Sequence, residues 1–339
     1  MQWKISVVFS FFNEEDVLEE LLQRMKLMFA ALGEQYVYEL IFVNDRSTDR
    51  SLDILTRHAK QDGRVKIVNM SRNFGVSECT LVGMKFASGD AVVIMDTDLQ
   101  DPPEVIPLMI QRWHEEEADV VYTIRTAREG EPIAKMLAIK LGYKILRYIS
   151  SIDLPVESGD FKLMTKRVVD QIIRLEETEP FLRGLVRWVG FKQVPVHYRR
   201  EPRHAGDTHY IFYGSRVLKN FLSGVTSFSV VPLYLIFILG LIVSSSAFLF
   251  LIFVFVMKYL GWNLPGWSAI MATLLTFGGI QILSLGIIGL YISKIHIEVK
   301  RRPNFIVENT IGFEDKSVII SYREQVTFTC NSIRNGHGN

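Results

Sequence analysis

The chain has 339 residues, with 38 basic and 37 acidic side chains and a formal net charge of +1. This balance excludes a nucleic-acid-binding surface over the whole protein, which needs a strong basic excess. Two cysteines, Cys79 and Cys330, are too few for a disulfide framework or a cysteine-rich zinc site. Residues 220–293 contain one charged side chain, Lys258, whereas the rest of the chain contains 74. A globular domain carries charges over its whole surface, so this distribution excludes a wholly soluble protein.

The N-terminal part of the chain alternates between predicted strands and predicted helices. Short apolar, β-branched runs predict the strands, and amphipathic patterns predict the helices. In chain order we expect a strand at 4–12, a helix at 15–32, a strand at 38–43, a helix from Ser51, a strand at 65–69, a helix at 77–87, and strands at 91–95 and 120–123. This alternation predicts an α/β fold with a mostly parallel, doubly wound sheet, which binds ligands beyond the carboxyl ends of its strands.

Polar clusters follow three of the predicted strands. They are Asn-Glu-Glu at 13–15, Asn-Asp at 44–45 and Asp-Thr-Asp at 96–98. Two carboxylates one residue apart, such as Asp96 and Asp98, can approach Mg²⁺ or Mn²⁺ together with diphosphate oxygens. No suitably placed Gly-x-x-x-x-Gly-Lys or Gly-x-Gly-x-x-Gly motif is present, which disfavours a P-loop or a dinucleotide site.

A basic amphipathic pattern occupies residues 133–150, where apolar positions alternate with Lys135, Lys140, Lys144 and Arg147. Such a helix is typical of contact with a membrane surface. The alternative is an ordinary half-buried helix with a solvated basic face.

Two charge-free runs, residues 229–257 and 259–293, are 29 and 35 residues long. Each exceeds the roughly 20 apolar residues that a helix needs to cross a bilayer. The connector between them contains Gly261, Pro265 and Gly266, which break a helix. The two runs therefore predict a transmembrane hairpin; the alternative is a pair of buried core helices in a large soluble domain.

Basic residues flank this predicted hairpin on both sides. Arg216 and Lys219 precede it, Lys294, Lys300, Arg301 and Arg302 follow it, and the connector offers Lys258. The positive-inside rule then places both flanks, and hence both termini, in the cytoplasm of a multi-pass protein of the cytoplasmic membrane. Four glycines in the second run permit close helix contact and are compatible with a homo-oligomer: Gly278, Gly279, Gly286 and Gly289.

We therefore expect four parts in the chain. They are a cytoplasmic catalytic domain at 1–210, an interfacial helix at 211–228, a two-helix transmembrane hairpin at 229–293, and a cytoplasmic tail at 294–339 with a strand pair at 317–322 and 325–329.

Several short motifs occur in order along the chain. They are Ser6-Val7-Val8 with residues 13–15, the runs at 44–49, 71–75, 96–104, 159–164, 181–184 and 203–210, and Arg301-Arg302-Pro303. Together with the spanning runs they resemble family 2 glycosyltransferases, and within these the polyprenyl-phosphate group that includes bactoprenol glucosyltransferases and dolichol-phosphate mannose synthases. The resemblance covers about residues 4 to 306. It implies a GT-A fold and an inverting, single-displacement transfer of a sugar from a nucleotide-sugar to a membrane polyprenyl phosphate.

The resemblance also implies roles for the matched residues. The nucleotide-sugar would contact Phe12, Glu14, Asp45, Asp96 and Thr97, and Mg²⁺ or Mn²⁺ would be held by Asp96, Asp98 and Gln100. Asp98 and Asp160 would be the catalytic residues. The second pKa of a phosphate is about 6, so the acceptor oxygen is already anionic near neutral pH. A strong base is therefore not obligatory, and Asp160 either deprotonates the acceptor or only orients it.

The acceptor phosphate needs cations near the membrane. The candidates are Arg125, Arg128, Arg183, Arg203 and His209. An arginine fork matches phosphate better than a lysine does. For each arginine the alternative is a solvated surface charge. His209 stands where the family usually has lysine, so a phosphate contact there would depend on pH; the alternative is a histidine that points to solvent.

The sequence thus predicts transfer of glucose from UDP-glucose to an undecaprenyl-type phosphate, giving a polyprenyl-phospho-sugar for cell-envelope glycosylation. One alternative is the same reaction with another donor, such as GDP-mannose. A second is a catalytically silent membrane scaffold that binds sugar nucleotides. A processive polysaccharide synthase is disfavoured, because two spanning helices are too few to build a polymer channel.

Overall fold

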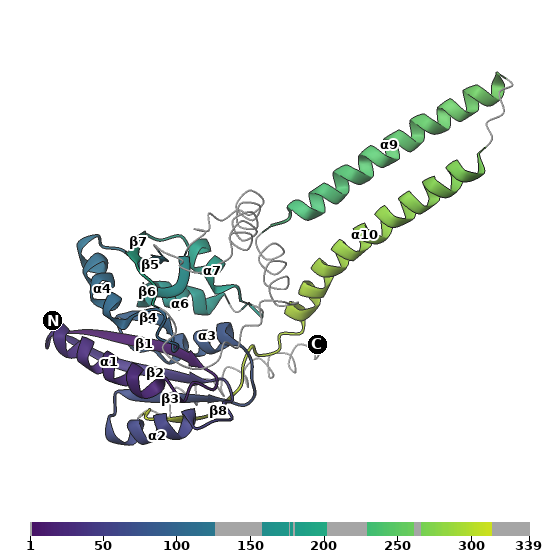
Figure 1. Cartoon of the computed structure of the whole chain (residues 1–339). Coiled ribbons are helices and arrows are strands. Elements are labelled where there is room, and N and C mark those ends of the chain that lie inside the picture. Colours follow the sequence, from purple (N-terminus) through teal and green to yellow (C-terminus); the bar gives the residue numbers. More distant parts are fainter. Residues whose placement is uncertain are drawn as a thin grey trace, which may run out of the picture. The chain divides into compact units, whose positions relative to one another are not determined.

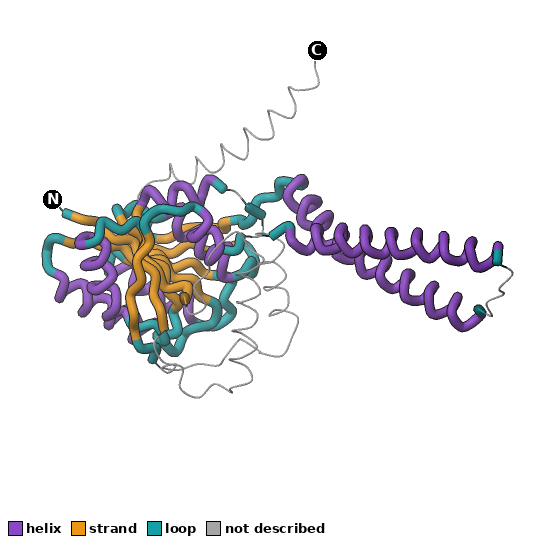
Figure 2. Tube along the Cα trace, turned by 90° about the horizontal axis from the view of Figure 1, so that it is seen from above, coloured by secondary structure: helices purple, strands orange, loops and turns teal. Residues whose placement is uncertain are grey.

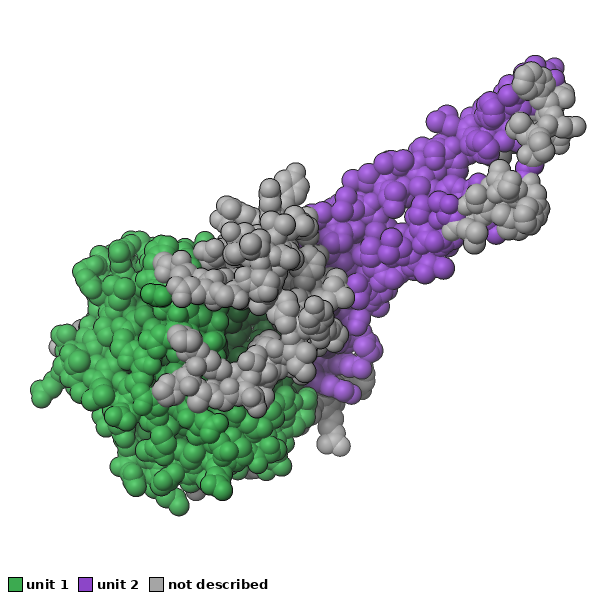
Figure 3. All heavy atoms as spheres, viewed as in Figure 1, with its two compact units in different colours: residues 1–132, 155–211, 303–339 green, residues 133–154, 212–302 purple. Residues whose placement is uncertain are grey.

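The structure is a computed structural model that describes residues 2–125, 158–175, 177–178, 180–201, 229–260 and 266–313. The chain divides into two compact units (Figure 3). The first unit comprises residues 1–132, 155–211 and 303–339, and the second comprises residues 133–154 and 212–302.

The first unit contains a sheet of eight described strands with helices between them (Figure 1). In chain order the first half consists of β1 (Trp3–Phe11), α1 (Leu18–Leu32), β2 (Tyr36–Asn44), α2 (Ser51–Gln61), β3 (Val65–Met70), α3 (Val76–Phe86) and β4 (Ala91–Asp96). The second half consists of η1 (Pro103–Val105), α4 (Ile106–Glu115), β5 (Val120–Arg125), β6 (Ser158–Thr165), α6 (Lys166–Arg174), α7 (Leu182–Trp188), β7 (Gln193–Tyr198) and β8 (Val307–Ile311).

The strands lie in the order β7-β5-β6-β4-β1-β2-β3-β8. β1 runs parallel to β2 and β4, β2 parallel to β3, and β5 parallel to β7. β6 runs antiparallel to both β4 and β5, and β8 runs antiparallel to β3. The α/β class and the mostly parallel sheet are confirmed, and three strands that the sequence did not predict, β6, β7 and β8, complete the sheet.

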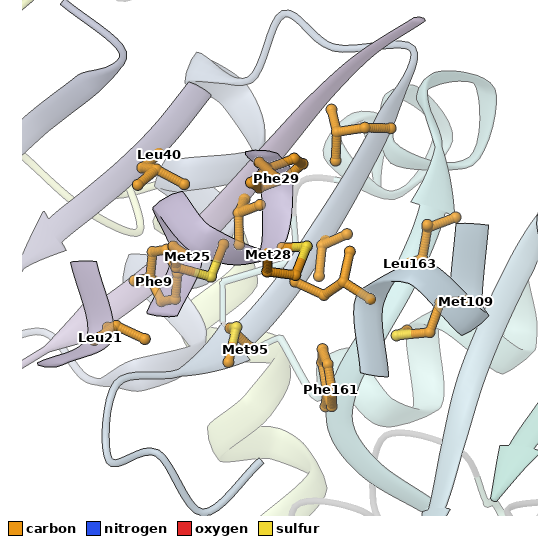
Figure 4. Packing of buried hydrophobic residues seen from close by; sticks show 14 of the residues in the cluster. Phe9, Leu21, Met25, Met28, Phe29, Leu40, Met95, Met109, Phe161 and Leu163 are labelled. Atoms are coloured by element: carbon orange, nitrogen blue, oxygen red, sulfur yellow. The ribbon is translucent and has the colours of Figure 1, made fainter. Parts of the chain in front are cut away.

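Both faces of the sheet are covered by helices (Figure 2), because successive apolar residues of the central strands point to opposite sides. On β2, Leu40 and Phe42 join one buried cluster with α1, whereas Ile41 and Val43 join the other with α3. Figure 4 shows part of the first cluster, with Phe9 among the labelled side chains. Phe9 stacks on Phe42 with ring centroids 4.7 Å apart.

A glycine lets α3 lie close to the sheet. A Cβ added at Gly83 would lie 2.2 Å from Cγ1 of Val8, so no larger residue fits there without movement. This contact fixes α3 against β1, and its N-terminus at Val76 follows the loop from the carboxyl end of β3.

The second unit contains an antiparallel pair of long helices, α9 (Val231–Tyr259) and α10 (Trp267–Val299), which lie side by side in Figures 1 and 2. The Tyr291 hydroxyl donates a hydrogen bond of 2.8 Å to the Ser229 carbonyl and joins the end of one helix to the start of the other. Two segments of 24 residues, Val231–Val254 and Thr276–Val299, are long and apolar enough to cross a membrane. The two predicted apolar helices are therefore confirmed.

Other predicted elements lie outside the described residues. They are the basic helix at 133–150, the interfacial helix at 211–228 and the strand pair at 317–322 and 325–329. The division of the chain at residues 210, 228 and 293 stays a prediction.

Candidate active site

The carboxyl ends of β1, β2 and β4 meet at one edge of the sheet. Phe11 lies opposite Asn44, and Ser10 lies opposite Asp96. The polar clusters that follow these strands therefore gather at the same edge, as the sequence predicted. We call the loops at 12–17, 45–50 and 97–102 the first, second and acidic loops.

The first loop is hydrogen-bonded to the second. Asn13, whose φ is 56°, accepts the Thr48 amide at 2.7 Å on Oδ1. Its own amide donates to Ser47 Oγ at 3.1 Å, and the Glu14 amide donates to Ser51 Oγ at 2.9 Å. These bonds hold the backbone of Glu14 against the second loop, which begins with Asp45. Glu14 and Asp45 are both predicted to contact the nucleotide-sugar. Phe12, also predicted to contact it, is half-buried in the first loop.

Asp45 is only 6% exposed, and both oxygens of its carboxylate accept backbone amides. The Phe74 amide donates to Oδ1 at 2.7 Å and the Gly75 amide to Oδ2 at 3.0 Å, at the N-terminus of α3. Burial raises the pKa of Asp45 above its usual range, and the two amides partly oppose that rise. Asp45 therefore ties the second loop to α3, and its contact with a nucleoside stays a prediction.

The acidic loop turns sharply after β4. Asp98 accepts the amide of Gln100 at 3.1 Å on Oδ1, and Leu99 between them has a φ of 56°. Thr97 is 3% exposed. Asp96, Asp98 and Gln100, the predicted metal ligands, are thus brought into one tight turn.

Negative charge accumulates around Asp96. Burial raises its pKa to about 7, and the carboxylates of Asp160, Asp101 and Asp98 add to that rise. Within the described ranges no group of three His, Cys, Asp or Glu side chains could hold a metal ion. Proteins usually bind Mg²⁺ through one or two carboxylates plus substrate phosphates, and the pair at 96 and 98 fits that smaller donor set.

Asp160 and Arg183 form a bidentate ion pair. Nε of Arg183 donates to Oδ1 of Asp160 at 2.7 Å, and Nη2 donates to Oδ2 at 2.5 Å. β4 and β6 are antiparallel, and Ile94 lies opposite Lys162. Continuing the same register by two residues places Asp96 opposite Asp160. The sequence assigned Asp160 to catalysis and Arg183 to the acceptor phosphate; the structure joins them.

The ion pair keeps Asp160 charged. Partial burial alone would raise the pKa of Asp160, but the guanidinium of Arg183 outweighs it and lowers that pKa below its usual range. The two side chains are 40% and 38% exposed, so solvent reaches the pair.

A buried lysine adjoins this pair, and sequence reasoning missed it. Lys162 is 5% exposed and lies two residues beyond Asp160, on the same face of β6. Burial lowers the pKa of Lys162 to about 8, although the charge of Asp160 opposes the change. Its only sequence signal was its place in the motif at 159–164.

Asp101, also missed, is the centre of a second buried cluster. It is 1% exposed and accepts a hydrogen bond from the Tyr198 hydroxyl. Arg125 Nη2 lies 3.6 Å from one oxygen of Asp101, and Arg200 Nε lies 3.5 Å from the other. Arg125, a predicted ligand of the acceptor phosphate, also donates to the Tyr198 hydroxyl at 3.2 Å. The cluster ties the acidic loop to the ends of β5 and β7.

Three predicted acceptor residues, Arg128, Arg203 and His209, lie outside the described residues, and their roles stay predictions. The amide of Glu201 donates to the Gln100 carbonyl at 2.9 Å. Glu201, the last residue described before these positions, therefore lies beside the acidic loop.

Comparisons with known proteins agree with this geometry. The sequence profile of glycosyl transferase family 2 matches residues 6–173. The uncharacterized glycosyltransferase YkcC of Bacillus subtilis (strain 168) is 44% identical over 321 residues, which are 94% of this chain and 97% of that protein. A prophage bactoprenol glucosyl transferase homolog of Escherichia coli (strain K12) is 35% identical over 306 residues, which are 90% of this chain and 98% of that protein.

Among solved structures, glucosyl-3-phosphoglycerate synthase from Mycobacterium tuberculosis in complex with Mn²⁺, uridine diphosphate and phosphoglyceric acid aligns with a TM-score of 0.45 and 20% identity, over 66% of this chain and 78% of that one. The mixed sheet, with helices on both faces, is that of a GT-A-like fold. The chain belongs to glycosyl transferase family 2.

Proposed function

We propose that the protein transfers glucose from UDP-glucose to an undecaprenyl-type phosphate in the cytoplasmic membrane. The observation that carries the proposal is the grouping of Asp96, Asp98 and the Asp160–Arg183 pair at one edge of the sheet, in a chain that also has two membrane-length helices. The bactoprenol glucosyl transferases among the relatives support the choice of acceptor and sugar.

The donor occupies the edge formed by the first, second and acidic loops. Phe12, Glu14, Asp45 and Thr97 form the nucleoside side, and Asp96 lies toward the ribose and diphosphate. A divalent cation, Mg²⁺ or Mn²⁺, would be held by Asp96 and Asp98 with Gln100 beside them, and would neutralise charge on the departing nucleoside diphosphate.

Asp160 orients the reaction in this proposal rather than accepting a proton. Its pKa is lowered and both its oxygens are bonded to Arg183, so it is a poor base. The acceptor phosphate is already anionic and attacks the anomeric carbon directly. The new bond joins that carbon to the acceptor oxygen, the bond to the diphosphate oxygen breaks, and the configuration inverts.

Arginines on the acceptor side receive the lipid phosphate. Arg183 presents a planar fork beside Asp160, and a phosphate oxygen anion competes with that carboxylate for the same donors. Arg125 lies in the neighbouring cluster with Asp101. Arg128, Arg203 and His209 complete the predicted acceptor set.

The two long helices anchor the enzyme where its acceptor resides. Basic residues on both flanks of the hairpin favour a cytoplasmic catalytic domain and cytoplasmic termini. A Cβ added at Gly278, Gly279, Gly286 or Gly289 of α10 would meet no atom within 4 Å, so these positions can accept a helix of a second copy.

The proposal is tested by nucleotide release from purified full-length protein in detergent. With undecaprenyl phosphate and Mn²⁺, we expect release of UDP from UDP-glucose and little release of GDP from GDP-mannose. The Asp98→Ala variant should abolish release, whereas Asp53→Ala, on the exposed face of α2, should not change it. Nucleotide-sugar binding without release would favour the silent scaffold, and faster release of GDP would favour the mannose donor.

A further inference from the structure

Three asparagine side chains form a row across the sheet, next to the proposed nucleotide site. Asn44 on β2 lies opposite Asn69 on β3, and Asn69 lies opposite Asn309 on β8. Nδ2 of Asn44 donates to Oδ1 of Asn69 at 3.0 Å. Nδ2 of Asn69 donates to Oδ1 of Asn309 at 2.7 Å. The row therefore links a strand that follows the membrane hairpin in the chain to the strand that precedes the second loop.

The inner end of the row shapes the second loop. Oδ1 of Asn44 accepts the Ser47 amide at 2.8 Å, which closes the turn that contains Asp45 and Arg46. Arg46 has a φ of 68°, a conformation that costs a non-glycine residue energy and needs support from its surroundings. Asn44 supplies part of that support.

The outer end of the row is fixed to the rest of the first unit by several contacts. The Ser71 amide donates to the Ile306 carbonyl at 3.0 Å, and Phe305 is only 3% exposed. Glu308 pairs with Arg46 of the second loop at 2.7 Å. The segment after α10 is thus connected to the second loop in two ways. Glu308 contacts Arg46 directly, and Asn309 is linked to Ser47 through Asn69 and Asn44.

Backbone pairing alone does not require asparagine at these positions, since the β3–β8 ladder is made by main-chain groups. Asn44 and Asn69 are 4% and 5% exposed, so their side-chain amides need partners within the protein. The acceptor oxygen of Asn309 satisfies one amide hydrogen of Asn69. Removing that oxygen leaves a buried donor without this partner and loosens the row that ends at Ser47.

We propose that Asn309 is a positioning residue for nucleotide binding, so that the segment after the membrane hairpin completes the donor side of the site. The inference rests on the proposed function, because it takes the second loop to be a nucleotide contact. Loss of the Asn309 oxygen weakens binding of the nucleotide and leaves the affinity for the lipid acceptor unchanged.

The test compares three variants of the full-length protein in detergent. Asn309→Leu keeps the approximate volume and removes the acceptor, Asn309→Asp keeps an acceptor oxygen, and Thr310→Val alters the adjacent residue of β8 as a control. UDP affinity is measured calorimetrically with Mg²⁺, and KM is measured separately for UDP-glucose and undecaprenyl phosphate. We expect Asn309→Leu to weaken UDP binding about 10-fold, the loss of one net hydrogen bond, with Asn309→Asp and Thr310→Val near the wild type.

The outcomes separate this inference from the proposed function. If the wild type binds no UDP and consumes no UDP-glucose, the proposed function fails. If the wild type binds UDP and Asn309→Leu binds it equally well, the role of Asn309 is refuted while the proposed function stands. An equal rise of both KM values in Asn309→Leu also refutes it, because a loosened edge strand would disturb the whole site.

Discussion

Glu39 carries a buried carboxylate near the amino ends of the central strands, and its replacement by glutamine tests how charge is stabilised inside this sheet. The side chain is 2% exposed. It accepts hydrogen bonds from Ser6 Oγ at 2.6 Å, from Lys66 Nζ at 2.8 Å and from the Ser88 amide at 2.8 Å. Burial alone would raise the pKa of Glu39, but these donors outweigh burial and lower it to about 2.

The size of the effect follows from that pKa. A carboxyl with a pKa of about 2 in the folded chain, against an ordinary 4.5, contributes about 3 kcal/mol to stability at neutral pH. Because the folded pKa is the lower one, this contribution is complete above the ordinary value and is lost as the pH falls toward 2. Glu39→Gln should therefore cost about 3 kcal/mol at pH 7, which lowers Tm by about 6–12 °C in a domain of this size.

The assay is thermal unfolding of the full-length protein in detergent, followed by tryptophan fluorescence. The matched control is Glu104→Gln: the Glu104 side chain is 54% exposed and pairs with Arg24 on the surface, so its loss should cost less than about 1 kcal/mol. At pH 4 the difference between Glu39→Gln and the wild type should already be about 1 kcal/mol smaller. A Tm for Glu39→Gln within ~2 °C of the wild type at pH 7 would refute this reasoning, because such a shift corresponds to less than about 1 kcal/mol. An equal fall in Tm for Glu104→Gln would refute it as well.

Three further predictions concern the site. Arg183→Lys keeps the charge but loses the bidentate bond to Asp160. We expect kcat/KM for the lipid to fall about 10-fold or more, with the KM for the donor unchanged. A change confined to the KM for the donor would contradict the acceptor role. Asp101→Asn leaves Arg125 and Arg200, whose side chains are 17% and 29% exposed, without their buried carboxylate. It should cost about 3–5 kcal/mol in thermal unfolding, so an unchanged Tm would count against the cluster. Arg203→Ala should raise the KM for the lipid far more than the KM for the donor, which steady-state kinetics measure directly; the opposite result would remove Arg203 from the acceptor site.

The central part of the fold was predictable because its signals are local. β1, β2 and β4 are mostly apolar runs, each closed or followed by polar residues, and parallel strands bring their ends to one edge. The acidic turn at Asp96 and Asp98 followed from the same pattern.

The elements and contacts that the sequence did not predict depend on partners far away in the chain. β8 is a five-residue strand whose Asn309 meets Asn69 across 240 positions, so no local pattern marks it. β6 includes Gly159 and alternates polar with apolar residues, and only its antiparallel place beside β4 gives Asp160 its neighbours. The pairing of Asp160 with Arg183 likewise requires α7 to be in position, which spacing alone does not reveal.

Product identity tests the central claim most directly. Purified full-length protein is incubated with undecaprenyl phosphate, UDP-glucose and Mg²⁺ or Mn²⁺, and the lipid fraction is analysed by mass spectrometry. We expect a lipid heavier by one hexose residue, formed by the wild type and absent with Asp98→Ala. Absence of any lipid-linked sugar with the common UDP- and GDP-sugars, or an equal yield from Asp98→Ala, would contradict it.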